Sequence, residues 1–244
     1  MAENTVIFIP ARLASTRLPN KPLKNLGGIP MILRVWEQAL RSEIGEGFVA
    51  SDNKEIENVV VGAGGKHVLT SKHHSTGTDR IAEALEKVDP DSSFKRIINL
   101  QGDLPNICPA NLTKVSDILD DSKVDIGTLV TYASADDLNN PNAVKVAASI
   151  NKKTRIGRAL YFSRNIVPAN KGKHYYHIGV YSYRPRSLKT FVLSNASILE
   201  KREKLEQLRA LENGMNISVA FVENKPIGVD TYEDFEKAEK YFNL

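Results

Sequence analysis

The residues with the clearest chemical potential form a short basic segment near the N-terminus. It reads Pro-Ala-Arg-Leu-Ala-Ser-Thr-Arg-Leu-Pro-Asn-Lys-Pro-Leu over positions 10–23, and Arg12, Arg17 and Lys21 place three cations within ten residues. Arginine supplies a planar fork that matches phosphate oxygens, and lysine supplies a compact charge. The segment therefore predicts binding of a phosphate-rich ligand such as a nucleoside triphosphate. Ordinary surface charge would produce the same composition, so position in the fold must decide between the two interpretations.

The other residues of this segment favour close contact between the backbone and a ligand. Ala11, Ala14 and Ser15 are small, so the chain can approach a ligand closely. Pro19 and Pro22 stiffen the segment and reduce the entropy that is lost when it becomes ordered. The spacing matches neither the Walker A motif nor G-x-G-x-x-G, so the sequence supports neither a P-loop NTPase nor a Rossmann dehydrogenase.

Two aspartates from distant parts of the chain could hold magnesium. Asp103 ends the stretch Gln-Gly-Asp, and Asp230 lies in Gly-Val-Asp-Thr near the C-terminus. Magnesium usually takes one or two protein carboxylates together with phosphate oxygens and water, and it would neutralise charge at the phosphate. Each aspartate also has a simpler interpretation. Asp103 could be a turn residue after a glycine, and Asp230 could stabilise the start of the following helix.

Alternating apolar and amphipathic runs must position these residues. Over the first ~105 residues, the sequence predicts strands at 6–10, 48–52, 67–70 and 96–103 and helices at 31–41, 55–63 and 79–88. A β-α-β order predicts an α/β fold with a parallel sheet covered by helices on both faces. Ligands of such sheets bind beyond the carboxyl ends of the strands, where the basic segment and Asp103 both lie.

The second half of the chain is richer in strands. The sequence predicts strands at 126–132, 144–150, 159–163, 178–183 and 217–222 and helices at 200–213 and 231–242. Thr231 is the expected N-cap of the last helix, with Asp234 at its third position. We expect one domain over residues 1–244, built on a mixed, mostly parallel sheet. Within it, residues from about 125 to 185 are expected to form a β-rich sub-region.

Composition excludes several classes of protein. The chain has 244 residues, a net charge of +4, 41% hydrophobic and 25% charged residues, which is typical of a soluble globular domain and not of a disordered one. Its single cysteine, Cys108, excludes an internal disulfide or a cysteine-rich zinc site. There is no signal-peptide core and no apolar stretch of membrane-helix length, so we expect a cytoplasmic protein with no membrane partner.

The basic segment resembles the nucleotide loop of the 3-deoxy-manno-octulosonate cytidylyltransferase (CMP-Kdo synthetase) family. The similarity runs in order from residue 6 to about 240, through blocks at 75–80 (STGTDR), 99–103 (NLQGD), 140–145 (NPNAVK), 159–164 (ALYFSR), 177–181 (HIGVY), 205–211 (LEQLRAL) and 228–231 (GVDT). The opening loop is shared with other sugar-nucleotide cytidylyltransferases. The YFSR, H-x-G-x-Y and LEQLR blocks are more specific to this family.

The resemblance implies both an architecture and a reaction. The fold would be the Rossmann-like fold of nucleotide-diphospho-sugar transferases, with the β-rich sub-region serving sugar binding or oligomerisation. The reaction would join CTP and 3-deoxy-D-manno-octulosonate (Kdo) to give CMP-Kdo and pyrophosphate for lipopolysaccharide assembly, with Mg²⁺ required and a homodimer as the common state. Arg12, Arg17, Lys21 and Asp103 would be catalytic, and Asp103 and Asp230 would ligate the metal.

The resemblance also assigns residues to the two substrates. The CTP site would comprise Pro10, Ala11, Arg12, Ser15, Arg17, Lys21, Ser75, Gly77, Thr78, Arg80 and Gln101. The sugar pocket would comprise Arg164, His177, Tyr181, Glu206 and Gln207. An acidic sugar needs a cation for its carboxylate and polar partners for its hydroxyls, which these residue types supply. The simpler interpretations are a strand-end arginine, a buried histidine bonded to its surroundings, and a solvated helix face laced with ion pairs.

This chain departs from the family pattern in three places. Leu104 follows Gln-Gly-Asp where the family usually has glutamate, which puts any metal or sugar role of that position in doubt. Ser75 and Thr76 replace the commoner Gln-Ser or Ala-Ser, and the segment 170–173 is short.

Two other functions remain open from the sequence. The first is the same chemistry on another acidic sugar, such as 8-amino-Kdo or a sialic-acid-like sugar. The second is a basic nucleic-acid-binding module, which is disfavoured because aromatic residues make up only 7% of the chain and 33 basic residues face 29 acidic ones. Transfer to phosphorus needs positioning and charge neutralisation, so we expect no nucleophilic side chain and assign no general base.

Overall fold

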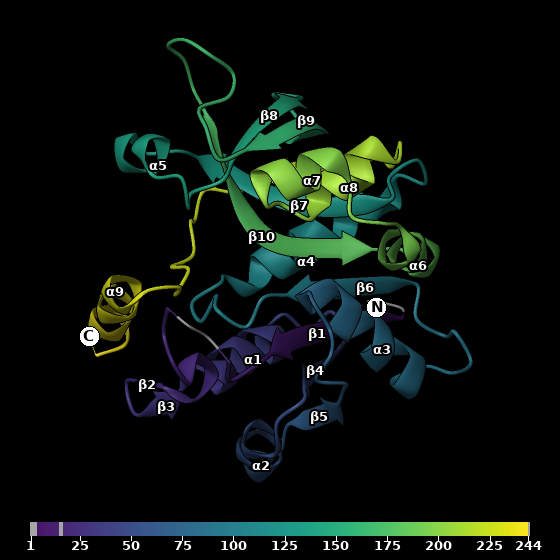
Figure 1. Ribbon diagram of the computed structural model, residues 1–244, viewed down its shortest axis with the longest axis vertical. Helices are drawn as coiled ribbons and strands as arrows, with labels where there is room; N and C mark the ends of the chain where they lie inside the picture. Colours follow the sequence, from purple (N-terminus) through teal and green to yellow (C-terminus); the bar gives the residue numbers. More distant parts are fainter. Residues whose placement is uncertain (1–3, 15–16, 244) are drawn as a thin grey trace. The chain divides into compact units, whose positions relative to one another are not determined.

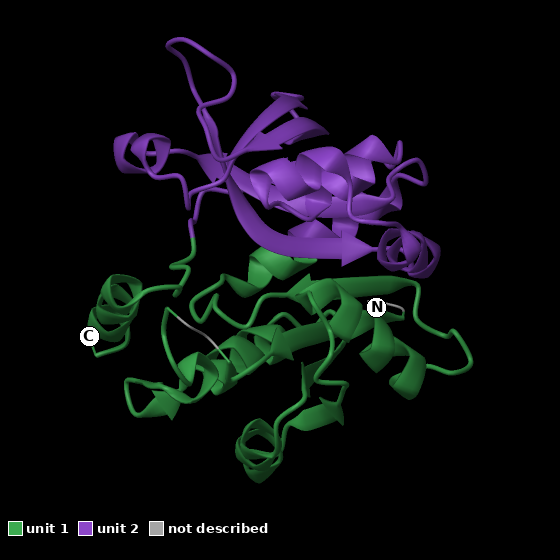
Figure 2. Ribbon diagram, in the orientation of Figure 1, with its two compact units in different colours: residues 1–113, 226–244 green, residues 114–225 purple. Residues whose placement is uncertain are grey.

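The computed structural model describes residues 4–14 and 17–243 (Figure 1). The chain divides into two compact units (Figure 2). Unit 1 comprises residues 1–113 and 226–244, and unit 2 comprises residues 114–225. In the described part of the chain, no helix combines the length and apolar character needed to cross a membrane.

Unit 1 is built on four parallel strands in the order β5-β4-β1-β6. Their bounds are β1 Thr5–Ala11, β4 Glu46–Ser51, β5 Lys66–Leu69 and β6 Arg96–Leu100. All seven residues of β1 are buried, although successive side chains point to opposite faces. A strand of this kind needs cover on both faces, which is the arrangement that the β-α-β pattern predicts.

The helices of unit 1 are α1 Met31–Arg41, α2 Lys54–Gly62, α3 Gly77–Val88, α9 Tyr232–Phe242 and the first part of α4 Pro109–Asp117. Four of them, α1, α2, α3 and α9, lie within two residues of their predicted bounds. Thr231 caps α9 and forms a capping box with Asp234, as expected. Three features of unit 1 were not predicted: α4, the hairpin of β2 Asn25–Leu26 and β3 Ile29–Pro30, and a 3₁₀ turn at Lys21–Leu23. These pieces are too short or too weakly amphipathic to show a period.

The last helix of the chain packs onto the residues that follow the basic segment. Leu18, Leu26, Met31, Val229 and Ala238 form one buried apolar cluster. Gly27 adopts φ +58°, and a Cβ atom there would lie 2.7 Å from the carbonyl oxygen of Phe242. The two ends of unit 1 are therefore held against each other, which places the chain before α9 beside the basic segment.

The fourth predicted strand is too long. The expected strand 96–103 ends at Leu100, and Asp103 lies in a turn beyond it, where the amide of Leu104 donates to the carbonyl of Gln101 (3.3 Å). Gly102 occupies this turn so close to β1 that a Cβ atom would lie 3.0 Å from the carbonyl oxygen of Pro10. The apolar run continues the strand pattern, but the turn leaves Asp103 free to face away from the sheet.

Unit 2 contains a mixed sheet in the order β10-β7-β11-β9-β8, and β8 pairs back onto β10. The strands are β7 Ile126–Tyr132, β8 Lys145–Ile150, β9 Ile156–Ser163, β10 Tyr175–Tyr183 and β11 Ile217–Phe221. Only the β7–β11 pair among these is parallel. The five predicted strands are all present, with β9 and β10 each starting three residues earlier than expected.

The prediction of a single helix over 200–213 is wrong. Unit 2 instead has α7 Ile198–Glu203 and α8 Gln207–Glu212, after α5 Ala135–Asn139 and α6 Pro185–Leu193. Lys204 adopts a left-handed conformation (φ 55°, ψ 48°), and the amide of Leu205 donates to the carbonyl of Glu200 at 3.2 Å. This pattern ends a helix, and the change of direction lets both Leu205 and Leu208 become buried.

Candidate active site

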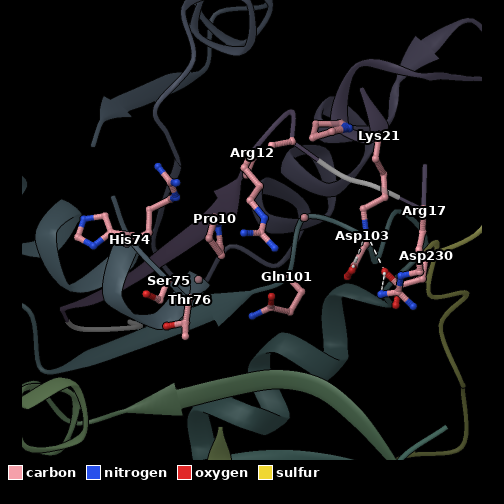
Figure 3. A pocket seen from close by; sticks show the side chains of 16 residues that line it. Pro10, Arg12, Arg17, Lys21, His74, Ser75, Thr76, Gln101, Asp103 and Asp230 are labelled. Atoms are coloured by element: carbon pink, nitrogen blue, oxygen red, sulfur yellow. Dashed lines mark hydrogen bonds and ion pairs between the residues drawn. The ribbon is translucent and has the colours of Figure 1, made fainter. Parts of the chain in front are cut away.

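A cavity of about 560 Å³ lies in unit 1 beyond the carboxyl ends of β1 and β6 (Figure 3). Its lining includes most of the residues that the sequence assigned to CTP and to the metal: Pro10, Ala11, Arg12, Arg17, Lys21, Ser75, Gly77, Arg80, Gln101, Asp103 and Asp230. Ser15, which was also assigned to CTP, lies outside the described residues. Thr78 is fully buried and is not in the described lining.

Backbone contacts bring the two aspartates together. The amide of Val229 donates to the carbonyl of Asp103 at 2.9 Å, which joins the turn after β6 to the segment before α9. The amide of Asp230 donates to the carboxylate of Asp234 at 3.2 Å, so the α9 cap also fixes the backbone of Asp230. The residue that caps α9 is thus Thr231 and not Asp230. The carboxylate of Asp230 lines the cavity instead.

Lys21 lies between the two carboxylates. Its Nζ atom is 3.0 Å from Oδ2 of Asp103 and 3.0 Å from Oδ1 of Asp230 (Figure 3). Arg17 also reaches Asp230, with Nη2 at 3.4 Å from Oδ1. One early segment and two distant segments therefore converge at one end of the cavity.

Burial and charge act in opposite directions on the pKa values of this cluster. Burial lowers the pKa of Lys21, but the nearby carboxylates of Asp103 and Asp230 outweigh it and raise the pKa above its ordinary value. Burial raises the pKa of Asp103, and the neighbouring Asp230 adds to this effect, while the Lys21 ammonium opposes it. The two carboxylates therefore need a cation between them, and Lys21 supplies it.

The same cluster fits a magnesium ion chemically. Two carboxylates converge on one cation, and oxygen is the ligand type that magnesium prefers. Across residues 4–14 and 17–243, no group of three or more His, Cys, Asp and Glu side chains could hold a metal. A metal held by Asp103 and Asp230 would need its other ligands from phosphate and water, as is usual for magnesium in nucleotide sites.

The charge balance of the cavity favours an anionic ligand. Four cationic side chains and two carboxylates line it: Arg12, Arg17, Lys21, Arg80, Asp103 and Asp230. Cavities with an excess of one sign concentrate ligands of the opposite sign. Leu104, where the family usually has glutamate, is buried and is not in the described lining; its side chain packs near Gly228.

Several of the residues assigned to CTP are fixed by neighbours beneath the cavity. The buried guanidinium of Arg80 donates through Nη1 to the Thr70 hydroxyl (2.6 Å) and through Nη2 to the Asp52 carboxylate (3.1 Å). The side-chain amide of Gln101 donates through Nε2 to Oδ1 of Asn99 (2.9 Å). This wall of the cavity is therefore held in place by polar contacts before any ligand binds.

The lining also includes His74 and Gly102, which the sequence did not assign to a ligand. Ala14 and Pro22 of the basic segment line it too, and so does Thr76, which lies within the 75–80 block that the resemblance places near the cytosine. Thr76 caps α3 and forms a capping box with Asp79. The pattern Thr-Gly-Thr-Asp is a recognisable signal for a helix start, which agrees with the position of Thr76 at this edge. A single histidine such as His74 carries no comparable signal.

In unit 2, the guanidinium of Arg164 contacts backbone carbonyls. It donates through Nε to Glu203 (2.8 Å), through Nη1 to Pro141 (2.9 Å) and through Nη2 to Lys204 (3.2 Å). Three of its five N–H groups are thus used, which leaves two for a ligand. Arg164 therefore ties its own segment to two others, at Pro141 and at 203–204, and its role toward a sugar carboxylate stays a prediction.

His177 is buried in unit 2 and makes a defined hydrogen bond. The Thr128 hydroxyl donates to the carbonyl of Val180 (2.8 Å) and therefore accepts from Nε2 of His177 (2.9 Å). The ring lies edge-on to Phe162, at 5.1 Å between centroids. Both observations favour the interpretation as a histidine bonded to its surroundings, and the role of His177 toward a sugar stays a prediction.

We expect His177 to make stability depend on pH. Burial lowers its pKa to about 3 from an ordinary 6.5, so the unfolded chain takes up a proton between these values and the folded chain does not. Its contribution to stability is lost as pH falls through this window, by about 1.4 kcal/mol per pH unit. Urea denaturation of His177→Asn should show a weaker dependence on pH between 6.5 and 4 than the wild type. An unchanged dependence would show that His177 does not stay neutral.

The other residues assigned to the sugar are also in unit 2. Burial raises the pKa of Tyr181 well above its ordinary value, with Tyr183 and Glu206 adding to the effect, so its phenol stays protonated. Its ring lies 5.4 Å from that of His177. Glu206 directly precedes α8, and Gln207 is the buried first residue of that helix. The broken helix thus gives these two neighbours different environments.

Comparisons with known proteins agree with this architecture. The sequence pattern of the cytidylyltransferase family matches residues 6–217. A protein of Paramagnetospirillum magneticum named 3-deoxy-manno-octulosonate cytidylyltransferase is 48% identical over 240 residues, which cover 98% of each chain. A protein of the same name from Rhizobium etli strain CIAT 652 is 48% identical over 239 residues, 98% of this chain and 95% of its own.

Solved structures show the same relationship. A CMP:2-keto-3-deoxy-manno-octonic acid synthetase in complex with CTP shares 37% identity and a TM-score of 0.88, with 98% of each chain covered. A 4-diphosphocytidyl-2C-methyl-D-erythritol synthase of Anaerococcus prevotii has a TM-score of 0.64 at 14% identity, which shows the shared nucleotidyltransferase-like fold alone. The expected mixed, mostly parallel α/β fold is confirmed, and the chain belongs to the 3-deoxy-manno-octulosonate cytidylyltransferase family.

Proposed function

We propose that this protein transfers the CMP group of CTP to Kdo and releases pyrophosphate, a step that supplies the activated sugar for lipopolysaccharide assembly. The observation that carries the proposal is the convergence of Lys21 with Asp103 and Asp230, at 3.0 Å each, in a cavity with an excess of cationic side chains. The names of relatives at 48% identity over nearly the whole chain support Kdo as the sugar.

The basic segment would bind the triphosphate. Arg12 and Arg17 offer planar forks to phosphate oxygens, and Lys21 offers a point charge from the same segment. Holding a polyanion at several points fixes the α-phosphorus in the position where an incoming hydroxyl can attack it, which is a large part of the acceleration for this type of reaction. The polar wall formed with Arg80 and Gln101 would position the nucleoside.

Asp103 and Asp230 would hold Mg²⁺ through carboxylate oxygens. Bound there, the ion supplies neutralisation of charge on the reacting phosphate. Lys21 now occupies the position between the same two carboxylates, so its ammonium must give up at least one of these contacts when a metal is held there. Released from the aspartates, Lys21 is free to turn toward a phosphate oxygen.

The bonds that change are simple to state. The oxygen of the anomeric hydroxyl of Kdo forms a bond to the α-phosphorus of CTP, and the bond from that phosphorus to the oxygen that bridges to the β-phosphate breaks. Pyrophosphate takes that bond's electron pair, and the hydroxyl proton passes to solvent. No covalent enzyme intermediate is needed, and Cys108 is not in the described lining of the cavity.

The sugar-binding residues are part of the proposal. Arg164, His177, Tyr181, Glu206 and Gln207 combine a cation, a neutral imidazole, a protonated phenol, a carboxyl group and an amide, which together can bond a carboxylate and several hydroxyls. We also propose that the protein acts in the cytoplasm, where CTP is available, and as a homodimer. Light scattering coupled to size-exclusion chromatography tests the last statement.

The proposal is tested by measuring pyrophosphate release with CTP, Kdo and Mg²⁺. We expect release that requires all three and that stops when EDTA is added, because the two carboxylates then have no divalent ion to hold. Parallel reactions with 8-amino-Kdo and a sialic acid identify the preferred sugar. Release that continues in excess EDTA would contradict the metal assignment. If neither Kdo nor any other acidic sugar supports pyrophosphate release, the proposed function is contradicted.

A further inference from the structure

His74 lies in the wall of the cavity without an assigned role. It belongs to the segment between β5 and α3 and lies at one end of the cavity with Ser75 and Thr76 (Figure 3). The cluster of Lys21, Asp103 and Asp230 lies at the opposite end of the same view. The two ends therefore differ in chemistry: one carries the ion pairs, and the other carries an imidazole and hydroxyl groups.

Glu83 holds this segment at two points. Its Oε2 atom accepts a hydrogen bond from the amide of Ser71 at 2.8 Å, and the same oxygen contacts Nε2 of His74. Ser71 and His74 are both half-buried, and Glu83 lies on α3, a helix that is itself capped by Thr76. One carboxylate thus links the start of the segment, the imidazole near its end and the helix that follows.

The charge state of Glu83 determines which nitrogen of the His74 ring is the hydrogen-bond donor to it. Although burial raises its pKa, hydrogen bonds from Lys87, Ser71 and His74 prevail and lower the pKa to about 2, so the carboxylate is ionised at neutral pH. An ionised carboxylate only accepts hydrogen bonds, so Nε2 of His74 must carry the proton. The imidazole is therefore held in one orientation and with one defined donor.

The negative charge of Glu83 is balanced outside the cavity. Lys87, one turn further along α3, pairs with the other carboxylate oxygen at 2.7 Å, and it also donates to the carbonyl of Leu69 at 2.7 Å. Neither Glu83 nor Lys87 is in the described lining of the cavity. This arrangement lets a carboxylate orient a residue of the cavity wall while its repulsion toward an anionic ligand is largely offset.

We propose that His74 contacts the nucleoside portion of the bound nucleotide and that Glu83 is the positioning residue that sets its orientation. The proposal rests on the proposed function, because it assumes a nucleotide in this cavity with its phosphates at the Lys21 end. It follows that loss of Glu83 weakens binding through His74, and that it weakens binding of the nucleoside end and not of the phosphate end.

The test measures dissociation constants by calorimetry with two probes, CMP and pyrophosphate, each in the presence of Mg²⁺. The proteins are the wild type, His74→Ala, Glu83→Gln and the double variant. Glu86→Gln is the matched control, since Glu86 is an exposed glutamate on the same helix. Glu83→Asp keeps the charge and serves if Glu83→Gln does not fold, and thermal melting checks each variant.

We expect His74→Ala and Glu83→Gln each to weaken CMP binding about tenfold and the double variant to be no weaker than either. Pyrophosphate binding should change by less than about twofold in all of them, and Glu86→Gln should match the wild type. Unchanged CMP affinity in Glu83→Gln, additive losses in the double variant, or an equal loss for pyrophosphate would overturn the proposal. A wild type that binds neither CMP nor CTP would instead overturn the proposed function.

Discussion

Replacement of Asp103 with asparagine should lower kcat about a thousandfold while the protein remains folded. The carboxylate is one of only two that line the cavity in the described chain, and a neutral amide is a poor ligand for magnesium. Charge neutralisation by a metal contributes several kcal/mol to such reactions, which corresponds to about three powers of ten. The fold should survive, because it is the backbone carbonyl of Asp103 that bonds to Val229.

The measurement is steady-state pyrophosphate release at saturating CTP and Kdo, together with a thermal melt. Asp91→Asn is the matched control, because it is the same chemical change at a residue that is exposed on the loop before β6. The control should retain wild-type kcat. If Asp103→Asn keeps more than about a tenth of the wild-type kcat, Asp103 does not ligate the metal.

The second large effect is expected from Lys21→Met, which should change two affinities in opposite directions. Binding of CTP with Mg²⁺ should weaken about a hundredfold, because a phosphate-binding charge is lost. Binding of Mn²⁺ alone should become tighter, because the wild-type ammonium lies 3.0 Å from both carboxylates and competes with a metal for them. In the variant, Asp103 loses its ion pair with Lys21, and among the described residues Asp230 keeps only the longer contact with Arg17 (3.4 Å), which favours any divalent cation.

Calorimetry gives the CTP affinity, and electron paramagnetic resonance of free Mn²⁺ gives the metal affinity without nucleotide. Lys54→Met is the control, since Lys54 is exposed on α2 and pairs only with Glu57 among the described acidic residues. It should leave both affinities unchanged. If Lys21→Met binds Mn²⁺ more weakly than the wild type, then Lys21 does not compete with the metal.

Much of unit 1 could be predicted from the sequence because its elements are long and strongly patterned. The apolar residues of α1 recur with the helix period, and its bounds match the prediction at both ends. The buried run of β1 lacks any polar alternation, which is typical of a central parallel strand. The break between α7 and α8 was not predicted, because it depends on the backbone conformation of one residue. No residue type in the charged run 200–213 indicates that Lys204 adopts a left-handed conformation.

The members of the candidate site were predictable, but their convergence was not. Residue types and strand-end positions indicated Lys21 and Asp103, and Asp230 was a candidate as a second carboxylate just before the last helix, with the family resemblance in agreement. What brings Asp230 to them is a backbone bond from Val229 and the packing of α9 on Leu18 and neighbouring side chains. Such long-range contacts leave no periodic signal in the sequence.

For Arg164, residue type and position in the sequence do not show what the side chain contacts. Its position after a strand and its residue type suggest a free cation for a carboxylate. The structure shows three donors already used on carbonyls of Pro141, Glu203 and Lys204. An arginine that closes turns and an arginine that binds a ligand look alike in a sequence, because only the surrounding carbonyls distinguish them.

The most direct test is a crystal structure of the protein with CTP and Mg²⁺. The proposal predicts the triphosphate against Arg12, Arg17 and Lys21, a metal ligated by carboxylate oxygens of both Asp103 and Asp230, and the ammonium of Lys21 moved from between these aspartates toward a phosphate. A metal bound through other side chains, or a triphosphate outside the 10–23 segment, would contradict it.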